Sequence, residues 1–89
     1  MKAIVTVIGK DRVGIISQVS AMLAEENVNV LDISQTVMRE YFTMIMLVDA
    51  SAIKSTFGDL AKKLAASGEE SGLSIRIQRE DIFNAMHRI

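Results

Sequence analysis

The sequence predicts an α+β fold of the ferredoxin-like type, in the order βαββαβ. The sheet is four-stranded and antiparallel, two helices lie on one of its faces, and a short C-terminal helix follows. Two observations carry this prediction. Segments with strand and helix periodicity alternate so that strand, helix and strand occur twice, which is the order of a split βαβ arrangement. The chain also has 89 residues and no proline, which suits a single domain without a linker.

The first unit contains a strand over residues 2–8 and a helix over residues 12–27. The strand segment KAIVTVI is rich in β-branched residues and apolar on both faces, which indicates a central strand. Asp11 is placed to cap the helix and Asn27 to end it. The apolar stripe of this helix consists of Ile15, Ile16, Val19, Met22 and Leu23.

Residues 29–38 and 41–49 are predicted to form an antiparallel hairpin, because only Arg39 and Glu40 separate them. The first of these strands alternates imperfectly and has one wetter face, which is typical of a sheet edge. Its apolar side contains Leu31, Ile33 and Val37, and its polar side contains Asp32, Ser34 and Thr36. The second strand, YFTMIMLVD, is apolar on both faces and is therefore expected in the centre of the sheet.

The second unit begins with a helix that Ser51 or Ser55 is expected to cap and that ends at Gly68 or Gly72. Its buried stripe is Phe57, Leu60, Ala61 and Leu64. Residues 73–79 alternate cleanly and predict a half-exposed edge strand. The last residues predict a short helix whose apolar stripe is Ile82, Phe83, Met86 and Ile89.

Right-handed crossovers place both long helices on one face of this sheet. The other face remains uncovered, although it carries either Ile45 and Leu47 or Met44 and Met46, depending on the register. We therefore expect the terminal helix, a partner or both to cover it. The predicted division is residues 1–79 for the main domain and residues 80–89 for a helical extension.

Composition limits the function. Hydrophobic residues make up 49% of the chain, although it has only three Phe, one Tyr and no Trp. This is a large apolar share for a small interior, and it favours a subunit interface, most simply a homodimer. The net charge of −1 does not indicate binding to nucleic acid or to a membrane surface. The first residues lack the long apolar core that a signal peptide has, and no segment is long and apolar enough to span a bilayer. A cytoplasmic protein is expected.

Catalysis, metals and cofactors find no support in the pattern. The chain has no cysteine, and His87 is its only histidine, so no ligand set for a metal is present. The serines have no histidine near them in sequence, and the glycines form neither a phosphate loop nor a dinucleotide fingerprint. The six methionines are best explained as core packing. No enzyme and no cofactor are therefore predicted.

The stretch GKDRVGIISQVSAMLAEENVNVLDISQ resembles the start of an ACT domain. That family begins with a strand, an Asp-Arg-x-Gly-type turn into a helix, and an Asn on the next strand. The matching residues here are Asp11, Arg12, Gly14 and Asn29, with Val13 at a position where the family often has proline. The resemblance covers residues 1 to 79. The length and the tail are similar to those of small standalone ACT-domain proteins.

The resemblance implies a regulatory module that binds an amino acid where the first loop of one subunit meets the second strand of another. It assigns this ligand to Asp11, Val13, Gly14, Ile15, Asn29, Asp32 and Gln35. Elementary chemistry agrees, since the first turn of a helix offers free amides to a carboxylate. An asparagine offers both a donor and an acceptor to an amino-acid head group.

Each of these residues also has a simpler structural explanation. Asp11 is a reasonable N-cap, Gly14 would allow close packing of the helix on the sheet, and Asn29 suits the turn into a strand. The favoured hypothesis is a dimeric module that senses an amino acid or a similar metabolite. The alternative is a protein-interaction module that docks on an enzyme or regulator without its own ligand. RNA binding ranks last, because aromatic residues are few and basic charge is not in excess.

Overall fold

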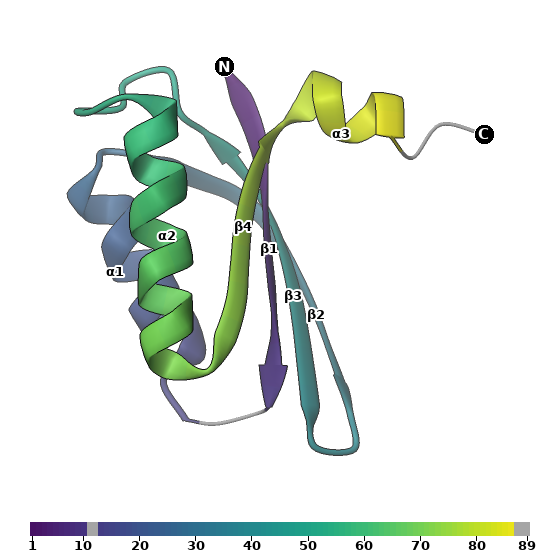
Figure 1. Cartoon of the computed structure of the whole chain (residues 1–89). Coiled ribbons are helices and arrows are strands. Elements are labelled where there is room, and N and C mark those ends of the chain that lie inside the picture. Colours follow the sequence, from purple (N-terminus) through teal and green to yellow (C-terminus); the bar gives the residue numbers. More distant parts are fainter. Residues whose placement is uncertain (11–12, 87–89) are drawn as a thin grey trace.

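The computed structural model describes residues 1–10 and 13–86, and Figure 1 shows their arrangement. The elements follow the predicted order. They are β1 (Lys2–Lys10), α1 (Ile15–Glu25), β2 (Asn29–Met38), β3 (Tyr41–Asp49), α2 (Phe57–Ser71), β4 (Leu73–Arg79) and α3 (Glu80–Met86). Asp11 and Arg12 lie outside the described residues, as do His87 and Ile89.

The sheet is antiparallel in the order β2-β3-β1-β4. This confirms that β1 and β3 are central and that β2 and β4 are the edges. Helices α1 and α2 cover one face, and α3 lies on the opposite side (Figure 1). Strand β1 runs two residues further than predicted, because Gly9 and Lys10 continue the pairing with Phe42 and Tyr41.

The core lies between the two long helices and one face of the sheet, which we call the helix face. The register decides which side of β3 is buried there. Met44 pairs with Val7, and Met46 pairs with Val5. All four are fully buried. Ile45 and Leu47 therefore belong to the other side, which we call the open face. Side chains on both long helices complete the core: Ile15, Val19, Leu23, Leu60 and Leu64.

Helix α1 begins three residues after its predicted start at 12. Gly14 occupies the N-cap with φ of 92°, and Asp11, the predicted cap, lies outside the described residues. An added Cβ at Gly14 would meet no heavy atom within 4 Å. Close packing is therefore not the reason for this glycine, and the left-handed backbone is.

The C-terminal end of α1 confirms the role of Asn27, which adopts φ of 60°. The amide of Asn27 donates to the carbonyl of Ala24 (3.0 Å), and the amide of Val28 donates to that of Leu23 (2.9 Å). This pair of bonds is a Schellman motif. Buried Val28 then leads the chain into β2.

Helix α2 is capped by Thr56, whose hydroxyl accepts from the amide of Asp59 (3.0 Å). Ser51 and Ser55 were expected here, but other partners hold them. Ser51 bonds Asp49 (2.6 Å) and Ser55 bonds Glu26 (2.8 Å). The helix ends at Gly72 (φ of 73°), the later of the two predicted positions. Gly68 lies inside it, where an added Cβ would come within 2.6 Å of the Leu73 carbonyl.

Strand β2 was expected to have one wetter face, yet residues 31–38 are exposed on both faces. A bulge between Val30 and Asp32 shifts the register. The end of the β2–β3 hairpin also extends past the helices (Figure 1). Leu31, Ile33 and Val37 are consequently 45%, 41% and 53% exposed, so this edge carries apolar side chains without cover.

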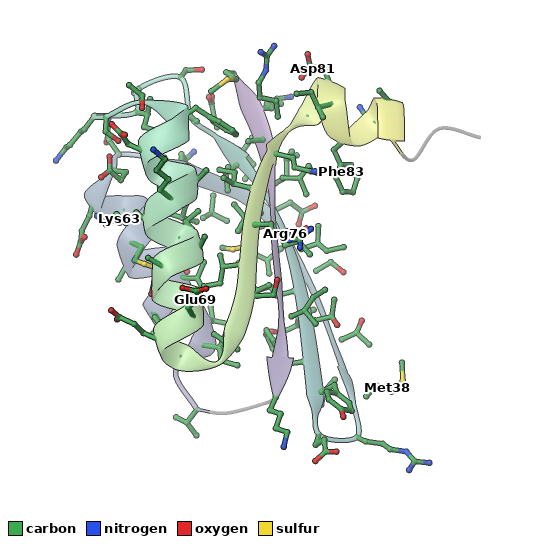
Figure 2. The ribbon with its side chains drawn as sticks, viewed as in Figure 1. Met38, Lys63, Glu69, Arg76, Asp81 and Phe83 are labelled. Carbon is green, nitrogen blue, oxygen red and sulfur yellow. The ribbon has the colours of Figure 1, made fainter. Side chains whose placement is uncertain are left out.

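Helix α3 turns back over the open face from the end of β4, as Figure 2 shows for Phe83. Phe83 is half-buried and lines a hollow together with open-face residues. Ile82, expected in the same buried stripe, is 47% exposed. The predicted contribution of Ile89 lies outside the described residues.

Candidate functional site

A surface hollow lies where the start of α1 meets the distal halves of β2 and β3. Its volume is about 290 Å³. Helix α1 contributes its first turn, and the two strands contribute side chains from their helix face. The lining residues are Gly14, Ile15, Ile16, Ser17, Gln35, Val37 and Phe42.

The first turn of α1 supplies hydrogen-bond donors to this hollow. The first intrahelical bond runs from the Gln18 amide to the Gly14 carbonyl (2.9 Å). The amides of residues 15–17 therefore come before the first intrahelical bond. Amides in this position are the usual free donors at the start of a helix. This turn carries no acidic residue that would oppose a negatively charged ligand.

The side chains around the hollow are of mixed character. Gln35 and Val37 lie on the helix face of β2, opposite Met44 and Phe42 of β3. Phe42 is 5% exposed and forms a rigid wall, whereas Ile16 is 38% exposed at the rim. The hollow thus combines backbone donors, one side-chain amide and an apolar wall.

Three residues of the predicted site meet here: Gly14, Ile15 and Gln35. Val13 directly precedes them and is 97% exposed. Asp11, also predicted, lies outside the described residues. Within one chain, the structure therefore brings together the glycine turn and the middle of β2.

Asn29 and Asp32 lie elsewhere in the same chain. Asn29 pairs with Asp49 at the start of β2, six residues from Gln35, which is roughly 20 Å along a strand. Asp32 pairs with Leu47 and so belongs to the open face, whereas Gln35 pairs with Met44 and belongs to the helix face. The Asp32 carboxylate accepts a hydrogen bond from the Ile33 amide (2.9 Å). A single chain cannot bring these two residues to the hollow.

Sequence reasoning missed four neighbours of the site: Ile16, Ser17, Val37 and Phe42. Val37 and Phe42 face each other across the hairpin, and the predicted two-residue link at 39–40 would have placed them opposite one another. Ser17 follows Gly14 by three residues, within one helical turn. Counting residue pairs backward from the hairpin turn would have identified the pair of Val37 and Phe42.

The shifted titratable groups lie away from this hollow. The Ser55 hydroxyl and then Lys63 hold the pKa of Glu26 below its ordinary value. The pKa of Asp49 is lowered by hydrogen bonds from Ser51. Contacts with Glu25 (3.1 Å) and Glu26 (3.4 Å) raise the pKa of Lys63. Glu25, Glu26 and Lys63 connect α1 with α2, whereas Asp49 contacts the amino group of Met1.

Neither a metal cluster nor a membrane-spanning helix is found in residues 1–10 and 13–86. No group of three or more His, Cys, Asp or Glu side chains there is arranged to hold a metal ion. No helix there has the length and apolar character needed to cross a membrane.

Comparison with known proteins gives a consistent result. The family model described as ACT domain matches residues 2–78. A UPF0237 protein of Clostridium acetobutylicum is 57% identical over 89 residues, which is all of both chains. The solved ACT domain protein from Streptococcus pneumoniae is 46% identical, with a TM-score of 0.82 over 98% of each chain.

The same fold also occurs as part of longer chains. In a formyltetrahydrofolate deformylase from Pseudomonas putida, the similar unit makes up 29% of that chain and matches 91% of this one. The TM-score is 0.79 at 16% identity, so this likeness concerns the fold alone.

Proposed function

Since the chain belongs to the ACT domain family, a family of regulatory domains, we propose that it is a regulatory protein that binds an amino acid or a similar small metabolite. The hollow at the start of α1 is the observation that carries the proposal. In this proposal the ligand lies between two copies of the chain. A cytoplasmic location stays a prediction.

The chemistry of the hollow suits the head group and the side chain of an amino acid. The amides of the first turn of α1 receive the carboxylate, with Gly14 leaving the approach open. The Gln35 carbonyl accepts from the ammonium group. Val37 and Phe42 contact the ligand side chain. A volume of about 290 Å³ fits a small metabolite rather than a large cofactor.

The second copy is proposed to pair along β2. An uncovered edge strand with apolar side chains is a ready template for another strand, and Leu31, Ile33 and Val37 supply such a surface. Antiparallel pairing about a two-fold axis places the start of one β2 beside the end of the other. This arrangement is how Asn29 would approach the hollow of the neighbouring copy, whereas Asp32 stays on the open face of the joined sheets.

A thermal-shift screen with the proteinogenic amino acids tests the proposal. A ligand that binds only the folded protein raises its melting temperature. Gln35→Ala should weaken the binding of the responding amino acid by about tenfold, because it removes a hydrogen bond to a charged group. Ser34→Ala is the matched control, since Ser34 neighbours Gln35 on the strand but pairs with Ile45 on the open face.

Calorimetric titration of both variants and of Asn29→Ala separates the outcomes. Weaker binding by Gln35→Ala and Asn29→Ala, with Ser34→Ala like the parent, supports a ligand shared between two copies. Equal binding by all three places the ligand elsewhere. If no amino acid shifts the melting temperature, the ligand proposal fails and docking on another protein becomes the working hypothesis.

A further inference from the structure

A second hollow lies on the open face of the sheet, beneath α3. Its volume is about 610 Å³, within the usual range of small-molecule pockets, roughly 300–1,000 Å³. Figure 2 shows Arg76 of β4 and Phe83 of α3 on this side of the sheet. The lining residues are Thr6, Ile8, Ile45, Ser74, Arg76, Gln78 and Phe83.

Three neighbouring strands and one helix build this hollow. Thr6 of β1 pairs with Ile45 on one side and with Arg76 on the other, and Ile8 pairs with Ser74. Alternate residues of a strand share a face, so these side chains form a continuous floor. Phe83 adds a wall from above. The hollow is thus made by the sheet and α3 together and lies on the opposite face from the proposed amino-acid site.

The floor has an apolar half and a polar half. Ile8 and Ile45 remain 48% and 41% exposed, although both lie in the two central strands. Ser74 and Arg76 lie on β4, Thr6 of β1 lies beside Arg76, and all three carry hydrogen-bond donors. A suitable ligand therefore has one apolar end and one end that accepts hydrogen bonds.

Arg76 makes the polar part of the hollow positively charged. Among residues 1–10 and 13–86, it is the only charged residue that lines the hollow, and it forms no ion pair within that part of the chain. Asp32 on the same face is three strands away, roughly 15 Å between Cα atoms. Asp81 of α3 is paired with Arg79 at 3.1 Å. Within the described residues, the hollow consequently offers a cation without an ion-pair partner beside apolar surface.

We propose that this hollow binds a small carboxylic acid with a compact aliphatic or aromatic group. The Arg76 guanidinium takes the carboxylate, since its planar donors match the two carboxylate oxygens. The hydroxyls of Thr6 and Ser74 donate to the same group. The apolar part of the ligand lies on Ile8 and Ile45 under the ring of Phe83. Helix α3 thereby acts as part of a binding site.

Methyl NMR of isoleucine-labelled protein tests this assignment. Isocaproate and hydrocinnamate are the probes, and their neutral amides are the matched controls. The acids should shift the methyl signals of Ile8 and Ile45, whereas Ile15 and Ile16 report on the amino-acid hollow and should stay unchanged. Each amide should bind about tenfold more weakly or worse, because the contact with Arg76 loses its charge.

Two pairs of variants identify the residues. Arg76→Gln should weaken binding of the acids about tenfold, while Lys62→Gln removes the same charge from exposed α2 and should have no effect. Phe83→Ala should also weaken binding, while Ile82→Ala, on the exposed side of α3, should not.

Any of four results would overturn the proposal. In the first three, neither acid shifts the signals of Ile8 and Ile45, acid and amide bind alike, or Arg76→Gln binds like the parent. In the fourth, the Ile8 and Ile45 signals change with protein concentration but not on addition of the acids. That outcome would mean that a second copy covers the open face.

Discussion

Gly14 shows how one backbone conformation shapes the proposed site. Its φ of 92° is left-handed, and space around an added Cβ is open. We predict that Gly14→Ala lowers the free energy of unfolding by about 1–2 kcal/mol, because an L-residue is strained there. Gly58→Ala is the control. Gly58 lies in α2 without positive φ, so this change should be neutral or should stabilise by up to about 1 kcal/mol.

Urea unfolding of the two variants measures both effects. Equal stability of Gly14→Ala and the parent would show that this turn relaxes at no cost. In that case the first turn of α1 would be less firmly positioned than the proposed ligand contacts require.

Capping residues show what single positions reveal before the fold is known. Asn27 was predicted as a helix end and adopts the left-handed conformation that asparagine tolerates. The cap of α2 was expected at Ser51 or Ser55 and is Thr56. All three have suitable hydroxyls, and tertiary partners decide among them. Glu26 holds Ser55 from a distant part of the chain, and local sequence carries no sign of that contact.

Glu26 connects elements that are distant in sequence. Its carboxylate accepts from the Ser55 hydroxyl (2.8 Å) before α2 and from Lys63 (3.4 Å) within α2. These contacts lower its pKa below the ordinary value of 4.5. A lowered folded-state pKa stabilises the protein above the unfolded-state value, and that contribution is lost as pH falls through the folded-state pKa.

We therefore predict that Glu26→Gln lowers the melting temperature at pH 7, and that the difference from the parent shrinks as pH falls below about 4.5. Thermal melts from pH 7 to pH 3 measure it. Glu70→Gln, which removes the same charge from exposed α2, should not reproduce this pH dependence. A Glu26→Gln difference that stays constant across the range would contradict the electrostatic explanation.

Helix α3 is too short to be stable alone, so its contact with the open face should hold it. We predict that removing residues 80–89 lowers the melting temperature. Phe83→Ala should lower the free energy of unfolding by about 1–2 kcal/mol. This is less than the cost of truncating a core phenylalanine, because the ring of Phe83 is only half-buried. Ile82→Ala, with a side chain 47% exposed, should cost less. Equal effects of the two substitutions would show that α3 does not pack through Phe83.

At the scale of elements, the sequence was informative wherever periodicity was clean. Strand β4 alternates, and Leu73, Ile75 and Ile77 are buried as predicted. Strand β3 is apolar on both sides, so only its pairing with β1 shows that Met44 rather than Ile45 is buried. For β2, a bulge and the extended hairpin change the exposure, and both depend on contacts beyond the strand itself.

For the whole molecule, two surfaces compete as the interface between copies. Ile33 on the β2 edge and Ile45 on the open face are both 41% exposed, which makes them a matched pair. We predict that the parent sediments at about twice the monomer mass of 9.8 kDa. Ile33→Lys should give monomers, because a charge opposes burial at that edge, and Ile45→Lys should leave the dimer intact.

Sedimentation at several protein concentrations measures these masses. A monomeric parent would contradict the proposed ligand site between two copies. Monomers from Ile45→Lys alone would move the interface to the open face and would leave no room there for a carboxylic acid.

Only part of the candidate site could be predicted from the sequence. The glycine turn and Gln35 were named, and the structure brings them together in one hollow. Asn29 and Asp32 were named with them, although they lie along β2 and on the open face. The resemblance assigned the first loop to one subunit and the second strand to another, without stating how the two subunits pair. That pairing depends on assembly, which a single chain does not encode locally.

The alternation of side chains along β3 has a consequence for how this protein tolerates sequence change. Phe42 faces one hollow, and Ile45, three residues later, faces the other. A substitution at either position alters one pocket and leaves the other intact, so the two proposed ligand specificities can change independently of each other. Loss of a single residue between them would instead turn the rest of the strand over. Ile45 and Leu47 would then point into the core, and Met46 would face solvent.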